Sequence, residues 1–406
     1  MKKLIAMLLA LAMVFALVAC GGGNDKPSSG TQSNPPASTS QDEGSASTGT
    51  DDPVSPVAGK KIAYIMLMTP ATIFQMWSES MTKTAEKLGM TAETFFCADD
   101  AQQWQDKIAA CAADGFDGLV VSHGGQEYAW SFLKDILEQY PDLTICTFDT
   151  PFKDENGNVQ KIDGVVQFFQ QDASFAALLV EELLKLNQDK VDAGEAVRIL
   201  QVQQGAGFNS PFDRRQVGYQ PYLDNGKIEN VERIAPVDNQ NATQSMREVT
   251  YATLQKYNDT EDIDGIWCCY DAYAQGVYAA LVEAGSNIPM VSVDICNEDI
   301  QFMQEGKNWK ACATTNWNHN GEFACRLIAL MMADEWDAIE SCKIYADYAE
   351  ANNGNWMELP ITIVTQEQVM SKDGINIENL GEVADASYTD ASWMPTCDWM
   401  AALLGH

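Results

Sequence analysis

Three apolar runs of the 406-residue sequence each end in an aspartate: Asp149, Asp271 and Asp294. A carboxylate accepts two parallel hydrogen bonds, which is the geometry that neighbouring hydroxyls of a sugar offer. A strand-end aspartate can instead cap the helix that follows it. For Asp149 and Asp294, the ligand-binding role and the capping role both remain open at this point. Asp271, which directly precedes a predicted helix, we interpret as a cap.

Two arginines follow a glycine-containing turn, Gly205–Gly207. The turn lacks the Gly-Lys-Ser/Thr ending of a P-loop and the third glycine of a dinucleotide fingerprint, so it does not predict a phosphate site. Ser210–Asp213 instead has the pattern of a helix start, with a cap, a proline and an acid. Arg214 and Arg215 lie one turn further on. One of them could reach a cleft as a fork of donors, and a surface salt bridge is expected for the other.

Neither a metal site nor a catalytic site is expected. Residues 154–158 have calcium-like oxygen spacing, but the glycine falls at position 4 instead of 6 and no glutamate stands at position 12. No Cys-x-x-Cys pair occurs, so the spacing excludes zinc and thioredoxin-like sites. The ten cysteines beyond Cys20 could form disulfides in an exported protein or fill the core as small apolar residues. No Gly-x-Ser-x-Gly occurs, and no cofactor is predicted.

The N-terminus predicts export. Two lysines precede 16 apolar residues, which are too few to span a bilayer but suit a secretory signal peptide. The sequence Leu17-Val18-Ala19-Cys20 resembles the lipobox of bacterial lipoproteins, which implies cleavage before Cys20 and a lipid on its sulfur. Residues 21–58 contain almost nothing large and apolar, so we predict a disordered tether.

Composition and charge bound the function classes. Asp and Glu number 58 against 25 Lys and Arg, giving a formal net charge of −33. This balance repels nucleic acid and anionic lipid headgroups. Apolar residues make up 46% of the chain, which predicts a packed globular protein, and the length suits two lobes.

The body of the chain alternates between predicted strands and helices. Strands are predicted at 61–68, 91–96, 118–121, 143–148, 197–202, 231–235, 265–269, 289–293 and 309–315. Helices are predicted at 74–88, 101–113, 128–138, 173–186, 211–223, 243–257 and 272–284. Such alternation predicts parallel sheets flanked by helices, an α/β fold. Ligands on such sheets bind beyond the carboxyl ends of the strands.

The order of these segments resembles the periplasmic binding proteins of the ribose- and galactose-binding type, over roughly residues 60–364. The matching segments are Lys61–Ile65, Ala85–Gly89, Ala113–Val121, Thr147–Asp149, Asp213–Tyr219, Tyr270–Gly276 and Val291–Asp294. The resemblance implies two Rossmann-like lobes joined by three crossings, near Gln170, near Thr315 and near Met357–Pro360. We therefore expect a signal peptide at 1–19, a tether at 20–58, a first lobe at 60–169 plus 316–356, and a second lobe at 170–315 plus 357–406.

The resemblance also implies roles for six residues. Phe74 matches an aromatic that stacks on the sugar, Asp149 and Asp294 match carboxylates that accept from hydroxyls, and Arg215 matches an arginine that donates to sugar oxygens. Tyr270 stands where an asparagine is usual, and Thr315 where a glutamine is usual. Thr150 replaces the arginine of ribose binders, and Val237 lies near an expected second stacking aromatic.

The function implied is that of an extracytoplasmic lipoprotein that captures a small sugar between its lobes and delivers it to an ABC permease. It would act as a monomer, held at the cell membrane by its lipid alone, and would bind no nucleic acid. Two alternatives remain. The same scaffold could bind a nucleoside, polyol or autoinducer, or paired carboxylates could serve a glycosidase.

Overall fold

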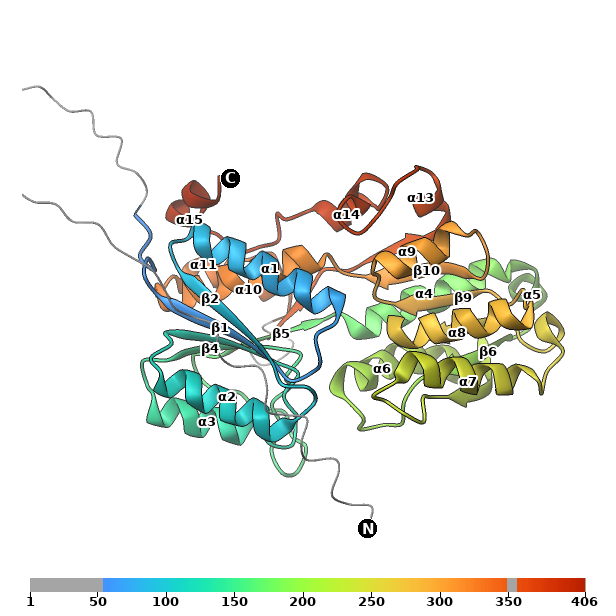
Figure 1. Cartoon of the computed structure of the whole chain (residues 1–406), viewed down its shortest axis with the longest axis horizontal. Helices are drawn as coiled ribbons and strands as arrows, with labels where there is room; N and C mark the ends of the chain where they lie inside the picture. Colours follow the sequence, from blue (N-terminus) through green and yellow to red (C-terminus); the bar gives the residue numbers. More distant parts are fainter. Residues whose placement is uncertain (1–53, 349–355, 406) are drawn as a thin grey trace, which may run out of the picture. The chain divides into compact units, whose positions relative to one another are not determined.

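The computed structural model describes residues 54–348 and 356–405. The predicted signal peptide, Cys20 and nearly all of the predicted tether lie outside these residues. Two six-stranded sheets organise the described chain (Figure 1). Among the described residues, no helix combines the length and the apolar character needed to cross a bilayer.

The first sheet has the strand order β11-β5-β4-β3-β1-β2, and its neighbouring strands are all parallel. Its strands are β1 (Lys61–Met66), β2 (Thr91–Phe96), β3 (Gly118–Ser122), β4 (Thr144–Phe148), β5 (Val166–Gln170) and β11 (Trp356–Leu359). Helices α1 (Thr72–Lys87) and α10 (Trp317–Met332) cover one face, while α2 (Ala101–Ala113) and α3 (Ala129–Gln139) cover the other (Figure 1). Each face has its own apolar core cluster. The strands are nearly continuous apolar runs because both faces are covered.

The second sheet has the order β12-β10-β9-β8-β6-β7 and is parallel except for β12, which runs antiparallel to β10. Its strands are β6 (Val197–Val202), β7 (Ile228–Ile234), β8 (Gly265–Cys268), β9 (Met290–Val293), β10 (Trp309–Thr314) and β12 (Thr362–Thr365). Its helices are α4 (Asp172–Leu186), α5 (Gln188–Ala193), α6 (Ser210–Asp224), α7 (Ala242–Leu254), α8 (Asp271–Ala284) and α9 (Asn297–Gln304). The predicted α/β class with two sheets is confirmed. The antiparallel edge strand was not predicted.

The chain passes between the sheets at three places in its central part. It leaves β5 for α4, leaves β10 for α10, and runs directly from β11 to β12. Because β11 pairs with β5 and β12 pairs with β10, this last crossing ties the edges of the two sheets together.

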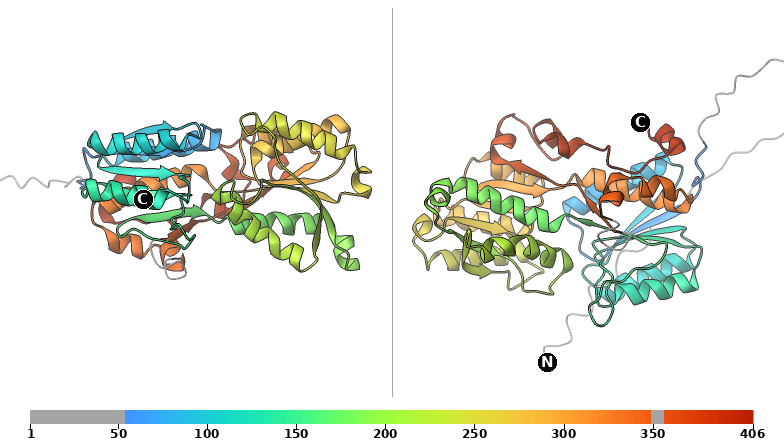
Figure 2. Two further views of the ribbon diagram at one scale, coloured as in Figure 1. Left: turned by 90° about the horizontal axis from the view of Figure 1, so that it is seen from below. Right: turned by 180° about the vertical axis from the view of Figure 1, so that it is seen from behind.

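The C-terminal tail makes a further connection, which corrects part of the expected lobe boundary. Short helices α11 (Trp336–Glu340) and α12 (Lys343–Tyr348) follow α10, and α13 (Gln366–Met370), α14 (Ala386–Thr389) and α15 (Asp398–Leu404) follow β12. Residues 357–406 were expected to complete the second lobe. Tyr388 does lie in the second core, but Trp393, Met394 and Met400 are buried in the first. The tail therefore returns to the first lobe, because its large apolar side chains are buried there (Figure 2).

Candidate functional site

Asp149 and Asp294 occupy the same structural position in the two sheets. Each directly follows a buried strand, β4 or β9, and each has a left-handed backbone, with φ of 46° and 70°. Their N–H groups continue the sheet hydrogen bonding to Phe168 and Ala313. Left-handed backbone in residues other than glycine is uncommon and concentrates at functional sites. Both residues are buried, with 1% and 2% of their surface exposed.

Each of these carboxylates keeps one oxygen without a hydrogen-bond partner in the protein. The oxygens are Oδ2 of Asp149 and Oδ1 of Asp294. The side-chain oxygens of Gln170 and Gln203 are likewise buried and unpartnered. Buried polar atoms usually have a partner, so these acceptors mark places where donors from another molecule would be stabilising.

A chain of ion pairs links the two aspartates. Arg214 Nη2 lies 2.5 Å from Asp149 Oδ1 and 2.5 Å from Asp172 Oδ2. Arg215 Nε lies 2.8 Å from Asp172 Oδ1, and its Nη2 lies 3.8 Å from Asp294 Oδ2. The order is therefore Asp149, Arg214, Asp172, Arg215, Asp294. The structure thus brings together three of the residues singled out in the sequence, Asp149, Arg215 and Asp294.

Asp172 is the central acid of this chain, and the sequence interpretation missed it. It is the first residue of α4, and its carboxylate accepts hydrogen bonds from Nε and Nη2 of Arg214 and Nε of Arg215. Its side chain is fully buried. The available signal was its place, an acid at a predicted helix start just after the expected crossing near Gln170.

Close packing of α6 on α4 brings the arginines to Asp172. Gly218 lies one turn beyond them on α6, and a Cβ at this position would lie 1.9 Å from the carbonyl oxygen of Ala173. Only glycine allows this approach of the two helices.

The expectation that one of the two arginines makes a surface salt bridge is wrong. Arg214 was expected to make a surface salt bridge if Arg215 reached the cleft. Instead its side chain is only 20% exposed and binds two buried carboxylates, that of Asp149 directly after β4 and that of Asp172 at the start of α4. Arg215 is 3% exposed, and its Nη1 donates to the carbonyl oxygen of Cys269 at 2.5 Å.

Phe74 lies near Asp149, at one end of the series of ion pairs, and the ring of His123 connects the two. Its ring meets His123 and Trp317 edge-on, at centroid distances of 5.5 and 5.7 Å. His123 Nε2 lies 3.9 Å from Asp149 Oδ2. Burial, and after it the charge of Arg214, lower the pKa of His123 to about 3. His123 is therefore neutral and does not compensate the charge of Asp149.

Tyr270 belongs to an aromatic group near the second end. Its ring lies 6.1 Å from that of Phe212 and 5.6 Å from that of Tyr273, measured between centroids. Phe212 in turn lies 5.6 Å from the Arg215 guanidinium carbon. Phe208, which is 46% exposed, stacks on Phe212.

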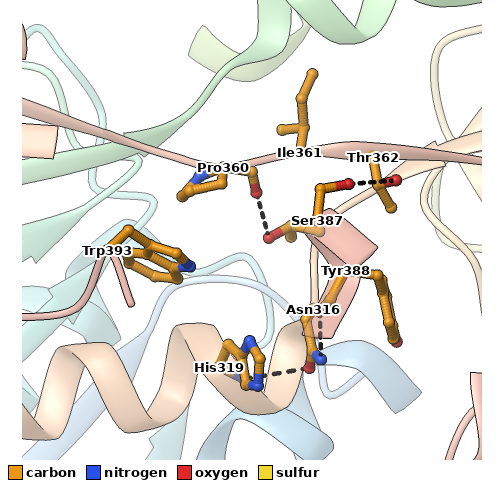
Figure 3. Close-up of a pocket in the computed structure, with 9 residues that line it drawn as sticks. Asn316, His319, Pro360, Ile361, Thr362, Ser387, Tyr388 and Trp393 are labelled. Atoms are coloured by element: carbon orange, nitrogen blue, oxygen red, sulfur yellow. Dashed lines mark hydrogen bonds between the residues drawn. The ribbon is translucent and has the colours of Figure 1, made fainter. Parts of the chain in front are cut away.

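Thr315 lies at the hinge and does not contact the ion-pair chain. Its hydroxyl is 3.0 Å from the Pro360 carbonyl oxygen and 3.0 Å from Asn320 Oδ1. It lines a small pocket formed by the crossing segments and the tail (Figure 3). There Asn316 donates to the Tyr388 carbonyl oxygen, and Ser387 bonds Thr362.

The second sheet holds two further buried acids, Asp271 and Asp299, beside Cys296. One carboxylate oxygen of each acid and Sγ of Cys296 all lie within 4.8 Å of one another. The Asp299 carboxylate accepts from Gln275 and from the N–H of Cys296, which begins α9. Asp271 is the first residue of α8 and accepts from the N–H of Ala272. Asp299 thus serves the start of α9. The cap interpretation of Asp271 is wrong, because Tyr270 is the cap residue of α8 and Asp271 is already the first residue of the helix.

Burial controls the protonation of these acids. It raises the pKa of Asp294 to about 8, with Arg215 opposing and Asp271 adding to the shift. It raises the pKa of Asp299 to about 6, and that of Asp271 well above its usual range. For Asp149, burial also raises the pKa, but Arg214 and then Arg215 act against it.

Two other motifs of the sequence have local roles. The Asp154 carboxylate accepts from the backbone of Asn156 and Asn158 and from the side chains of Asn158 and Gln160. It therefore closes a polar turn. The ten described cysteines form no disulfide with one another; Cys397 is half-buried and the other nine are buried.

The matches to known proteins agree with this architecture. The model of the "periplasmic binding protein domain" family matches residues 62–335. Among solved structures, a sugar ABC transporter protein from Yersinia enterocolitica is 25% identical over 86% of this chain and 95% of its own, with a TM-score of 0.69. A 5-methylthioribose transporter solute-binding protein from Thermotoga lettingae is 19% identical over 85% and 98%, with a TM-score of 0.68. An Agrobacterium vitis solute-binding protein with bound allitol is 16% identical over 78% and 98%, with a TM-score of 0.59. No curated protein matches significantly.

Proposed function

The chain belongs to the periplasmic binding protein family, and we propose that it captures a small uncharged sugar between its lobes and delivers it to an ABC permease. Proteins of this family are located outside the cytoplasm, where they bind solutes for transport, and the family is not an enzyme family. The observation that carries the proposal is the pair of buried, unpartnered carboxyl oxygens, one at the end of each sheet, on Asp149 and Asp294. A polyhydroxylated ligand supplies donors to both.

The charge balance favours an uncharged ligand. Arg214 directs Nε, Nη1 and Nη2 at Asp172, Ser210 and Asp149, so its donors are engaged. Arg215 directs Nε at Asp172 and Nη1 at a backbone carbonyl. The carboxylates of Asp149 and Asp172 therefore already balance the two guanidinium charges. The whole protein has a formal net charge of −33. An anionic group would enter this site without a free cation to meet it.

Protonated Asp294 suits a sugar in a second way. With its pKa raised to about 8, it carries a proton at neutral pH and can donate to a ring or hydroxyl oxygen. Asp149, paired with Arg214, stays an acceptor. The two ends of the site thus offer one acceptor and one donor, which together fit a hydroxyl-rich neutral molecule.

A polyol is the second candidate, because it offers the same hydroxyls without a charge. The Agrobacterium vitis relative holds allitol, a polyol. A thermal-shift panel that contains pentoses, hexoses, their reduced polyols and their phosphate esters tests both candidates. A ligand at 100 times its Kd adds about 2.7 kcal/mol, which shifts the melting midpoint by several degrees. We expect shifts with neutral members only. Shifts with phosphate esters alone would contradict the charge argument.

We also propose that a lipid on Cys20 anchors the mature chain, which acts as a monomer at the outer face of the cell membrane. The support is the sequence Leu17-Val18-Ala19-Cys20 behind a short apolar segment. Replacing Cys20 with alanine should leave a soluble, sugar-binding protein and abolish its retention in the membrane fraction. Fractionation followed by immunoblotting measures this. Retention of the Cys20→Ala protein would show that another element holds it.

A further inference from the structure

Arg214 makes contacts with three different parts of the fold. Its Nη2 reaches Asp149, directly after β4 of the first sheet. Its Nε and Nη2 bind Asp172, at the start of the helix that follows the first crossing. Its Nη1 donates to Ser210, at the start of its own helix α6. One guanidinium therefore joins a site residue of the first lobe, the hinge and the second lobe.

A second contact with the first lobe supports this placement. The Arg214 guanidinium carbon lies 4.8 Å from the centre of the Phe169 ring, on β5. A planar guanidinium can stack on an aromatic ring while its edge binds carboxylates, and a lysine cannot do both. Phe169 itself is buried and stacks on Trp356 of β11, so the ring that receives Arg214 is fixed within the first sheet.

Asp172 fixes the direction of Arg214. Its two oxygens are divided between the arginines, with Oδ2 on Arg214 and Oδ1 on Arg215. Because the Asp172 side chain is fully buried, its charge strongly favours the arrangement in which both guanidiniums remain beside it. The same argument applies to Asp149, whose burial makes the loss of its cation unfavourable.

We infer that Arg214, held by Asp172, is a positioning residue that ties Asp149 to the hinge and draws the two lobes together through its own ion pair. The claim that Arg214 positions Asp149 for the sugar rests on the proposed function. The claim that Arg214 holds the lobes together does not depend on the proposed function. The bridge supplies a bond between the lobes that needs no ligand, and the sugar adds hydrogen bonds to a carboxylate already set in place.

The test measures the distance between the lobes without any sugar. Spectroscopic labels are introduced through non-natural residues at exposed Ala110 of α2 and exposed Ala252 of α7, in the full chain. Native cysteines are left untouched, because nine of the ten described are buried. Double electron–electron resonance then gives the distance distribution for the wild type, Arg214→Met, Arg214→Lys, Asp149→Asn and the double variant Arg214→Met/Asp149→Asn.

We expect Arg214→Met and Asp149→Asn each to shift the distribution to longer distances by several ångströms. The double variant should shift it no further than the larger single variant, because both changes remove one contact. The distance in Arg214→Lys should fall between those of the single variants and that of the wild type. Lysine restores the positive charge but not the planar set of guanidinium donors.

The matched control is Arg198→Met. Arg198 binds buried Asp264 within the second lobe, with Nη2 to Oδ1 at 2.9 Å, and its side chain is 25% exposed against 20% for Arg214. Its loss should lower the melting temperature and leave the distance distribution unchanged. An Arg214→Met protein with the wild-type distribution would overturn the inference. If that variant does not fold, Asp149→Asn tests the same contact from the other lobe, and an unchanged distribution there is equally decisive.

Discussion

The two ends of the ion-pair chain share a backbone design but differ in charge. Asp149 and Asp294 both follow a buried strand, both have positive φ, and both keep one free oxygen. Asp149 lies 2.5 Å from an arginine and beside a neutral histidine. Asp294 lies 3.8 Å from Arg215, and the charge of the buried acid Asp271 adds to the rise of its pKa. The same local geometry therefore places a carboxyl group directly on a cation in the first lobe and a proton carrier in the second.

The largest effect that would test this difference is on sugar affinity. Asp149→Asn removes a charge that Arg214 needs, along with charged hydrogen bonds of about 1.5–3 kcal/mol each to the ligand, so Kd should rise about a hundredfold or more. Asp294→Asn replaces a group that is protonated at neutral pH with a neutral amide of similar shape, so Kd should change less than about tenfold. Calorimetric titration at pH 7 measures both.

Alanine at either position provides the control for these amide variants. Asp149→Ala and Asp294→Ala each remove every hydrogen bond of the side chain, and both should weaken binding about a hundredfold. If the alanine variants lower the melting temperature but keep their affinity, these aspartates serve the fold and not the ligand. Equal losses for the two asparagine variants would instead remove the distinction between the lobes.

A pair of glycines separates helix packing from site geometry. A Cβ at Gly218 would lie 1.9 Å from the Ala173 carbonyl oxygen, and one at Gly321 would lie 2.0 Å from that of Trp77, in the first lobe. Each substitution with alanine should cost about 1–3 kcal/mol of stability, measured by urea unfolding. Gly218→Ala should also weaken sugar binding, because it moves α6 and its arginines away from Asp172. Gly321→Ala, on α10, should leave affinity near wild type.

The smallest expected effect is on the pH dependence of stability. The pKa of Asp294 is about 8 in the folded protein and about 3.9 when unfolded, so the folded state binds the extra proton. Its contribution to stability is complete below about pH 4 and is lost as the pH rises towards 8. Between pH 6 and 7 this amounts to about 1 kcal/mol. Urea unfolding at these two pH values should show that slope in the wild type and a smaller one in Asp294→Asn. An unchanged slope would mean that Asp294 is ionised at these pH values.

The sequence predicted the residues at the carboxyl ends of the strands better than the contacts between the lobes. Asp149 and Asp294 were placed at strand ends because alternating strands and helices imply parallel sheets, whose carboxyl ends lie at one edge. Their role in ligand binding was implied by the resemblance and stays a prediction. Arg214 and Asp172 were not assigned, because their pairing depends on how a helix after one crossing meets a helix of the second lobe. No local pattern carries that information; it follows from the close approach of α6 and α4 at Gly218.

The tail shows a similar limit. Trp393, Met394 and Met400 are apolar enough to predict burial, but their sequence position after β12 pointed to the second lobe. This error concerns a segment that joins the lobes, where partners are distant in sequence. Thr315 was placed by resemblance; its hydroxyl donates to the Pro360 carbonyl oxygen, and its role in ligand binding stays a prediction.

The return of the tail has a consequence for the order in which the protein is made. The first lobe contains β11 and the helix α15, which both follow strands β6–β10 of the second sheet in sequence. Its sheet is incomplete until Leu359 has been produced, and its core is incomplete until Met400 has been produced. The earlier part of this lobe must wait, with an apolar face uncovered, while the whole second lobe is produced. Long-range pairings of this kind slow folding and prolong exposure to aggregation. The first lobe is therefore completed only after most of the second lobe has been produced.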